Sequence, residues 1–211
     1  MIDWLLNEFP AWFTTGLYHI LDVNGYDHML FLWCLCVRYT IPSWKSVLWL
    51  VTAFTVGHSI TLITTTLGIR ILPNPWVELA IAISIFISAA LPFLKNLRKS
   101  KSDFWNIIEI QSTSVSYYGL ALCFGFIHGM GFSTLLIELL GNQSEIALPL
   151  LGFNLGIEFG QLIFVLSILS IATLLKSVQR RIYHRFITVS LIAGVLLSMF
   201  MIIDRIYQTT P

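Results

Sequence analysis

Titratable side chains interrupt otherwise apolar stretches of this sequence. Three are histidines, His28, His58 and His128, and two are carboxylates, Asp27 and Glu158. A charged residue in the middle of a membrane helix costs roughly 2.5–3.5 kcal/mol on insertion scales, so it needs a partner. Neutral imidazole together with carboxylate suits nickel, cobalt, zinc or iron(II). We therefore interpret these residues as candidate ligands of one divalent transition metal.

Other polar residues are candidates for supporting roles. Three could orient the ligands through hydrogen bonds: Ser59, Asn154 and Gln161. Two others, His19 and Glu78, could line a cavity around the site. Both have simpler interpretations, because His19 also suits an interfacial polar position and Glu78 also suits the start of a helix, where the helix dipole favours an acid.

The composition is that of an integral membrane protein surrounded by lipid. The chain has 211 residues, of which 56% are hydrophobic and only 11% charged, whereas soluble domains carry about 25% charged residues. The apolar runs are continuous rather than alternating, which favours helices over a β-barrel. A net charge of +1 argues against a nucleic-acid partner.

The apolar runs predict an all-α, polytopic protein with one transmembrane domain over residues 1–211. We expect six spans, at about 26–40, 47–69, 76–94, 117–140, 148–175 and 186–203. Residues 1–24 have apolar side chains at helical spacing with frequent polar breaks, which predicts an interfacial or re-entrant amphipathic helix.

The basic residues predict the orientation of these spans. With six spans, ten of the 12 Lys and Arg residues fall on one side of the membrane, and only Arg70 and Arg205 fall on the other. The crowded side is cytoplasmic by the positive-inside rule. Both termini are then outside, and we expect the protein in the inner membrane of a bacterium.

The candidate ligands are predicted to share one depth. At about 1.5 Å per helical residue, His58, His128 and Glu158 lie roughly 15–20 Å from the nearest span end, close to the middle of a ~30 Å hydrocarbon core. His28 reaches the same depth if Arg38, 10 residues later, is held at the cytoplasmic surface. The turn before His28 must then dip into the bundle, where protein or water surrounds it. We expect a polar cavity open to the exterior.

The fifth predicted span carries a ridge of small residues. Gly152, Gly156 and Gly160 recur every four residues. Such a ridge lets a neighbouring membrane helix approach closely.

Four ordered segments resemble the HupE/UreJ family. They are Asn24-Gly-Tyr-Asp-His28-Met-Leu-Phe, Phe54-Thr-Val-Gly-His58-Ser-Ile-Thr-Leu, Phe126-Ile-His128-Gly-Met-Gly-Phe132 and Phe153-Asn-Leu-Gly-Ile-Glu158-Phe-Gly-Gln161. The resemblance extends from about residue 19 to residue 161. It implies hydrogenase or urease accessory functions and a role in nickel or cobalt permeation. It also implies metal contact for Asp27, His28, His58, His128 and Glu158.

The sequence is compatible with three functions. The leading hypothesis is a nickel- or cobalt-type permease. The second is an intramembrane zinc-dependent hydrolase, in which Asp27 or Glu158 is the general base and the substrate is a lipid or a membrane-anchored chain. The third is a non-catalytic accessory or metal-storage subunit, bound to a partner protein or to a second copy of the chain.

Overall fold

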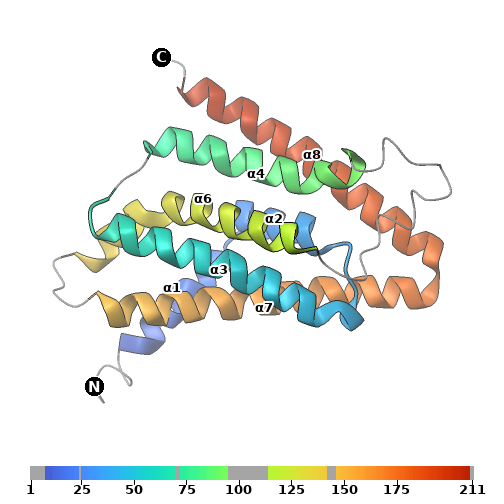
Figure 1. The fold of residues 1–211 in the computed structure, drawn as a ribbon, viewed down its shortest axis with the longest axis horizontal. Coiled ribbons are helices and arrows are strands. Elements are labelled where there is room, and N and C mark those ends of the chain that lie inside the picture. Colours follow the sequence, from blue (N-terminus) through green and yellow to red (C-terminus); the bar gives the residue numbers. More distant parts are fainter. Residues whose placement is uncertain (1–7, 24, 70–71, 95–113, 142–145, 210–211) are drawn as a thin grey trace.

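The computed structural model of the protein describes residues 8–23, 25–69, 72–94, 114–141 and 146–209. Every regular element within these ranges is a helix (Figure 1). They are α1 (Phe9–Leu21), α2 (Tyr26–Cys36), a 3-10 turn (Ile41–Ser43), α3 (Trp44–Thr66), α4 (Asn74–Leu94), α6 (Val115–Leu140), α7 (Ala147–Val178) and α8 (Arg180–Thr209).

Five of the described helices, α3, α4, α6, α7 and α8, are long and apolar enough to cross a membrane. They correspond to the last five predicted spans. The first predicted span, 26–40, differs, because α2 has only 11 residues and is about 16 Å long at the helical rise. Gly25 precedes this helix and Pro42 follows it, and both residue types interrupt helices. Six full-length spans are therefore not confirmed.

α3 and α6 pack side by side in the same direction. A Cβ atom placed on Gly125 would collide with the carbonyl oxygen of Phe54, and one placed on Gly129 would collide with the carbonyl oxygen of His58. Because both residue numbers rise together along the contact, the helices are parallel. Their backbones can approach this closely only because glycine has no side chain.

α1 packs in the same manner against the first half of α7. Gly152 lies near Phe9 and Trp12 of α1, and a Cβ on Gly156 would collide with the carbonyl oxygen of Phe13. The close approach predicted from the glycine ridge is confirmed, and the neighbour is α1. An interfacial helix over 1–24 is not confirmed, since α1 lies lengthwise on another helix; residues 1–7 and 24 lie outside the described residues.

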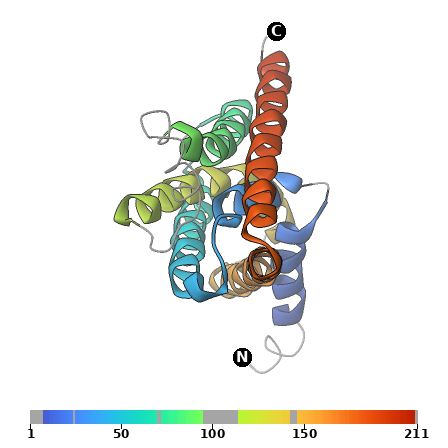
Figure 2. The same ribbon diagram turned by 90° about the vertical axis from the view of Figure 1, so that its right-hand side faces the viewer.

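α4 and α8 form the third close pair, and both ribbon views place them side by side (Figures 1 and 2). Gly194 of α8 lies against Ala89 of α4 and Cys34 of α2, and at the other end Arg205 pairs with Glu78. This pair is antiparallel. The start of α4 and the end of α8 consequently form one rim of the bundle.

Candidate metal centre

Four histidine rings meet inside the bundle. His19 comes from the end of α1, His28 from the start of α2, and His58 and His128 from the middles of α3 and α6. The ring centroids are 4.6 Å apart for His19 and His28, 5.0 Å for His28 and His128, 5.9 Å for His28 and His58, and 6.0 Å for His19 and His58. The shared depth predicted from the sequence thus corresponds to a shared place, and His19 joins the cluster.

The close helix pairs explain why these rings meet. Gly129 brings α6 onto the backbone of His58, so that His128, the residue before it, lies beside α3. On the other side, the Gly156 contact holds α1 against α7, which fixes the end of α1 where His19 lies. Small residues therefore set the spacing between the helices that carry the imidazoles.

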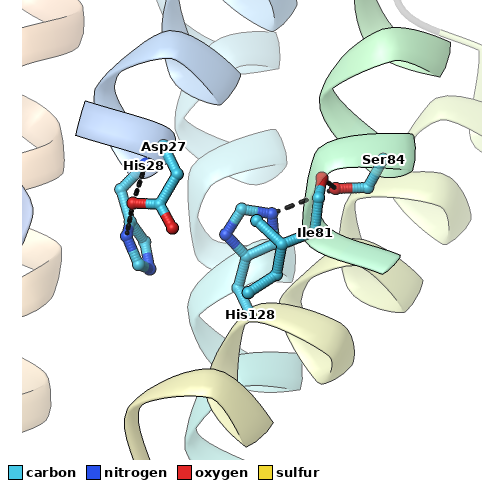
Figure 3. A network of polar contacts seen from close by, with 5 residues as sticks. All are labelled: Asp27, His28, Ile81, Ser84 and His128. Atoms are coloured by element: carbon cyan, nitrogen blue, oxygen red, sulfur yellow. Dashed lines mark hydrogen bonds and ion pairs between the residues drawn. The ribbon is translucent and has the colours of Figure 1, made fainter. Parts of the chain in front are cut away.

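Asp27 fixes the ring of His28. Its Oδ1 atom accepts the backbone N–H of His28 at 2.8 Å and lies 3.0 Å from the ring Nδ1 (Figure 3). An ionised carboxylate only accepts hydrogen bonds, so Nδ1 carries the proton and Nε2 keeps a free lone pair. Metal-binding histidines in proteins are commonly oriented by a carboxylate in this way.

Ser84 of α4 fixes the tautomer of His128 in a similar way. The Ser84 hydroxyl donates to the carbonyl oxygen of Ile81 at 2.7 Å and also lies 3.1 Å from Nε2 of His128 (Figure 3). A hydroxyl has a single proton, which Ile81 takes, so Nε2–H of His128 is the donor to Ser84. The Nδ1 atom of His128 is then unprotonated.

Each ring has at least one buried nitrogen atom without a hydrogen-bond partner among the described residues. These atoms are Nε2 of His19, Nε2 of His28, both ring nitrogens of His58 and Nδ1 of His128. The side chains of His58 and His128 are fully buried. Buried polar atoms are nearly always paired, so several orphaned nitrogens in one cluster indicate a place for an ion or for water.

Four ring separations within the cluster are close to the distance between two imidazole ligands of one transition-metal ion. At a metal–nitrogen distance of about 2.0–2.1 Å, ring centroids lie ~3.2 Å from the ion, and two ligands at a tetrahedral angle have centroids about 5.2 Å apart. The observed separations of 4.6–6.0 Å bracket that value. As the side chains stand, no group of three His, Cys, Asp or Glu in the described ranges is arranged to hold a metal. The rings would have to turn about their side-chain bonds to bind one.

A cavity of about 270 Å³ leads to the cluster. Its wall includes His19, Asp27, His28 and His128, and its rim carries Glu78 and Arg205. These two rim residues form an ion pair of 2.9 Å, and their side chains are 44% and 34% exposed. The cavity therefore opens at the end of the bundle where α4 begins and α8 ends.

Three buried phenylalanines, Phe31, Phe54 and Phe124, close the other side of the cluster. Each lies one helical turn from a histidine, on α2, α3 and α6 respectively, and always away from the rim. The ring of Phe31 lies 5.0 Å from Phe54, 5.6 Å from Phe124 and 5.1 Å from His128. These aromatic rings form an apolar floor beneath the imidazoles.

A comparison with protein families matches residues 4–205, nearly the whole chain, to the family described as HupE / UreJ protein. The chain belongs to the HupE/UreJ family. The resemblance based on the four sequence segments is thereby confirmed. No curated protein and no solved structure matches the sequence.

Glu158 of this HupE/UreJ chain lies apart from the residues that line the cavity. It accepts a hydrogen bond from the hydroxyl of Thr52 at 3.1 Å, in a polar seam between α3 and α7. Two further contacts of 2.7 Å extend the seam, from Ser59 Oγ to Asn154 Oδ1 and from Thr55 Oγ1 to Gln161 Oε1. Among the predicted ligands, the structure groups Asp27 with the histidines and places Glu158 in this seam.

Two residues at the site were not identified from the sequence as functional. Ser84 is one hydroxyl among apolar residues of α4, and spacing alone gives no sign that it faces His128. Arg205 is, in the sequence, one of the two basic residues predicted on the outer side. Its position opposite the acid Glu78 was the available signal, because two opposite charges near the same surface tend to pair.

Proposed function

We propose that this HupE/UreJ protein is a permease for a divalent transition metal of the nickel or cobalt type. The observation that carries the proposal is the cluster of four imidazoles with unpaired, buried nitrogens beside a cavity that opens at one end of the bundle. The family's association with nickel and cobalt supports the choice of ion. The metal is the transported substrate here, rather than a resident cofactor.

Different residues of the site have different roles in the uptake of the ion. Asp27 places a carboxylate in the wall of the cavity, which attracts a cation, whereas the charge of Glu78 at the rim is paired with Arg205. The imidazoles of His19, His28, His58 and His128 then replace its water ligands. Asp27 keeps Nε2 of His28 available, and Ser84 keeps Nδ1 of His128 available.

Passage to the other side requires the phenylalanine floor to move. Phe31, Phe54 and Phe124 form an apolar layer on the side of the cluster away from the rim, and the polar side chains of the seam between α3 and α7 are paired with one another. Transporters that bind their substrate near the middle of the membrane commonly expose the site to one side at a time. We infer that the structure represents the outward-open state of such a cycle.

We also propose that α1 and α2 together make the sixth crossing, as a broken helix. α1 follows the first half of α7, whereas Trp33 of α2 lies 6.5 Å from Phe164 and the N–H of Ile41 bonds Thr173 further along α7. The break then lies beside His19 and His28, and half-helix ends near a central site are a feature of many transporters. This topology keeps both termini outside, in the inner membrane of a bacterium.

Uptake of nickel into proteoliposomes tests the proposal. We expect purified protein to carry nickel into vesicles above the level of empty vesicles, and the His58→Ala variant to lose at least nine-tenths of that uptake. His184→Ala is a matched control, since His184 is a buried histidine at the opposite end of the molecule. Uptake no greater than that of empty vesicles would contradict the proposal.

A second candidate is an intramembrane zinc hydrolase, favoured by one observation. The phenylalanine floor closes the side of the cluster away from the rim, and hydrolysis tolerates that closure better than transport does. Zinc held by three histidines would activate a water molecule, and Asp27 would be the nearest carboxylate base. Release of product from a lipid or a membrane-anchored peptide by the zinc-loaded protein, without accumulation of metal in vesicles, would favour this candidate.

A further inference from the structure

The rim of the cavity includes a guanidinium, which is unexpected beside a cation site; it lies between two carboxylates, 2.9 Å from Glu78 and 3.9 Å from Asp204. Arg205 lines the same cavity as His28, His128 and Asp27. Its guanidinium is fixed by several contacts, with Nη1 2.9 Å from Glu78 Oε2 and 3.0 Å from Gln208 Oε1. Gln208 in turn donates to Asp204 at 2.8 Å. The charge therefore stays at the rim instead of moving freely in solvent.

Arg205 has two effects on an approaching cation. Its charge repels every divalent cation to the same degree, because Coulomb repulsion depends on charge and distance only. Arg205 also forms an ion pair with Glu78, the carboxylate at the rim, and so makes it less available to a cation. Without Arg205, Glu78 and Asp27 would present carboxylate oxygens together in one small cavity, and such oxygens are the ligands that magnesium and calcium prefer.

Different metals can overcome that repulsion to different degrees. Nickel, cobalt and zinc gain strongly from imidazole nitrogen, whereas magnesium and calcium bind it poorly. The imidazoles of His19, His28 and His128 line the same cavity, and the ring of His58 lies behind them, 5.9 Å from that of His28. All divalent cations are repelled equally at the rim, but only transition metals gain strong coordination by imidazole inside the cavity. The combination selects for transition metals.

We propose that Arg205 is a specificity-determining residue, which excludes magnesium and calcium from the cavity by repelling them and by holding Glu78. This inference rests on the proposed binding of a transition metal at the histidine cluster. A purely structural role is the alternative, since the same ion pair joins α4 to α8.

Competition between nickel and magnesium separates the two roles. Nickel binding to the purified full chain is measured by calorimetry with and without millimolar magnesium. We expect magnesium to weaken nickel binding of wild type by less than twofold and that of Arg205→Gln by tenfold or more. Arg205→Lys keeps the charge and should restore resistance to magnesium.

Glu78→Gln is the matched control, because it breaks the same link between α4 and α8 but keeps the guanidinium charge. Its nickel binding should stay resistant to magnesium. Equal sensitivity of Arg205→Gln and Glu78→Gln, or a folded Arg205→Gln as resistant as wild type, would overturn this inference alone. Wild-type protein that binds no nickel would overturn the proposed function as well.

Discussion

The ring of His28 is held by the carboxylate of the residue directly before it, with 3.0 Å between Nδ1 of His28 and Oδ1 of Asp27. The same oxygen accepts the backbone N–H of His28. Asp27 thus orients the ring of His28 from within the first turn of α2. The Asp directly before His28 in the sequence therefore keeps Nδ1 of that ring protonated and leaves its Nε2 available at the cluster.

The first prediction concerns Asp27→Ala. Without the carboxylate, His28 loses the acceptor that fixes its tautomer, and residues that orient a metal ligand typically contribute 10–100-fold to affinity. We expect nickel affinity, measured by calorimetry, to fall by about that factor. Asp204→Asn is the control, because Asp204 lies at the rim without lining the cavity. Unchanged affinity of Asp27→Ala would show that the pair has no part in binding.

The second prediction uses two serines one turn apart on α4. Ser84 accepts from Nε2–H of His128, whereas the hydroxyl of Ser88 donates to the backbone carbonyl of Ser84, and both side chains are buried. Ser84→Ala leaves the His128 ring free to change tautomer, so we expect nickel affinity to fall roughly tenfold. Ser88→Ala should leave the affinity within twofold. Equal effects of the two substitutions would indicate a packing effect only.

The level of the histidines along the bundle could be predicted from the sequence, but the direction in which a side chain points around the bundle could not. Counting residues along each span placed His28, His58 and His128 at one level, and their rings do meet. The same count placed Glu158 at that level, yet it faces Thr52 in the seam between α3 and α7. Rotation of a helix about its axis depends on contacts with its neighbours, which one sequence does not contain.

The packing of α1 against α7 could not be predicted from the sequence, for a related reason. The tryptophans and scattered polar residues of the sequence 1–24 are typical of a helix at the membrane surface. The packing of α1 depends on Gly16, which lies against the carbonyl oxygen of Phe153 of α7. The glycine ridge of α7 predicted that a close neighbour exists, but the identity of that neighbour is a property of the assembled bundle.

The third prediction tests Glu158 as a metal ligand. Because Glu158 bonds Thr52 and does not line the cavity, we expect Glu158→Gln to bind nickel within about threefold of wild type. The glutamine carbonyl can still accept from Thr52. Metal content after purification, compared with that of His58→Ala, is the measurement. Loss of metal as complete as in His58→Ala would restore Glu158 to the ligand set.

The fourth prediction concerns the phenylalanine floor and separates transport from hydrolysis. Phe124 is buried and contacts Phe31, so Phe124→Ala opens a gap below the imidazoles and costs about 3–5 kcal/mol of stability. If the floor is the inner barrier to the ion, nickel uptake into vesicles should become severalfold faster while nickel binding is kept. Phe164→Ala, which removes a phenylalanine packed on Trp33 outside the floor, should leave the uptake rate unchanged. A folded Phe124→Ala variant that binds nickel but carries it no faster than wild type would mean that the floor does not limit passage, and hydrolysis would then be favoured over transport.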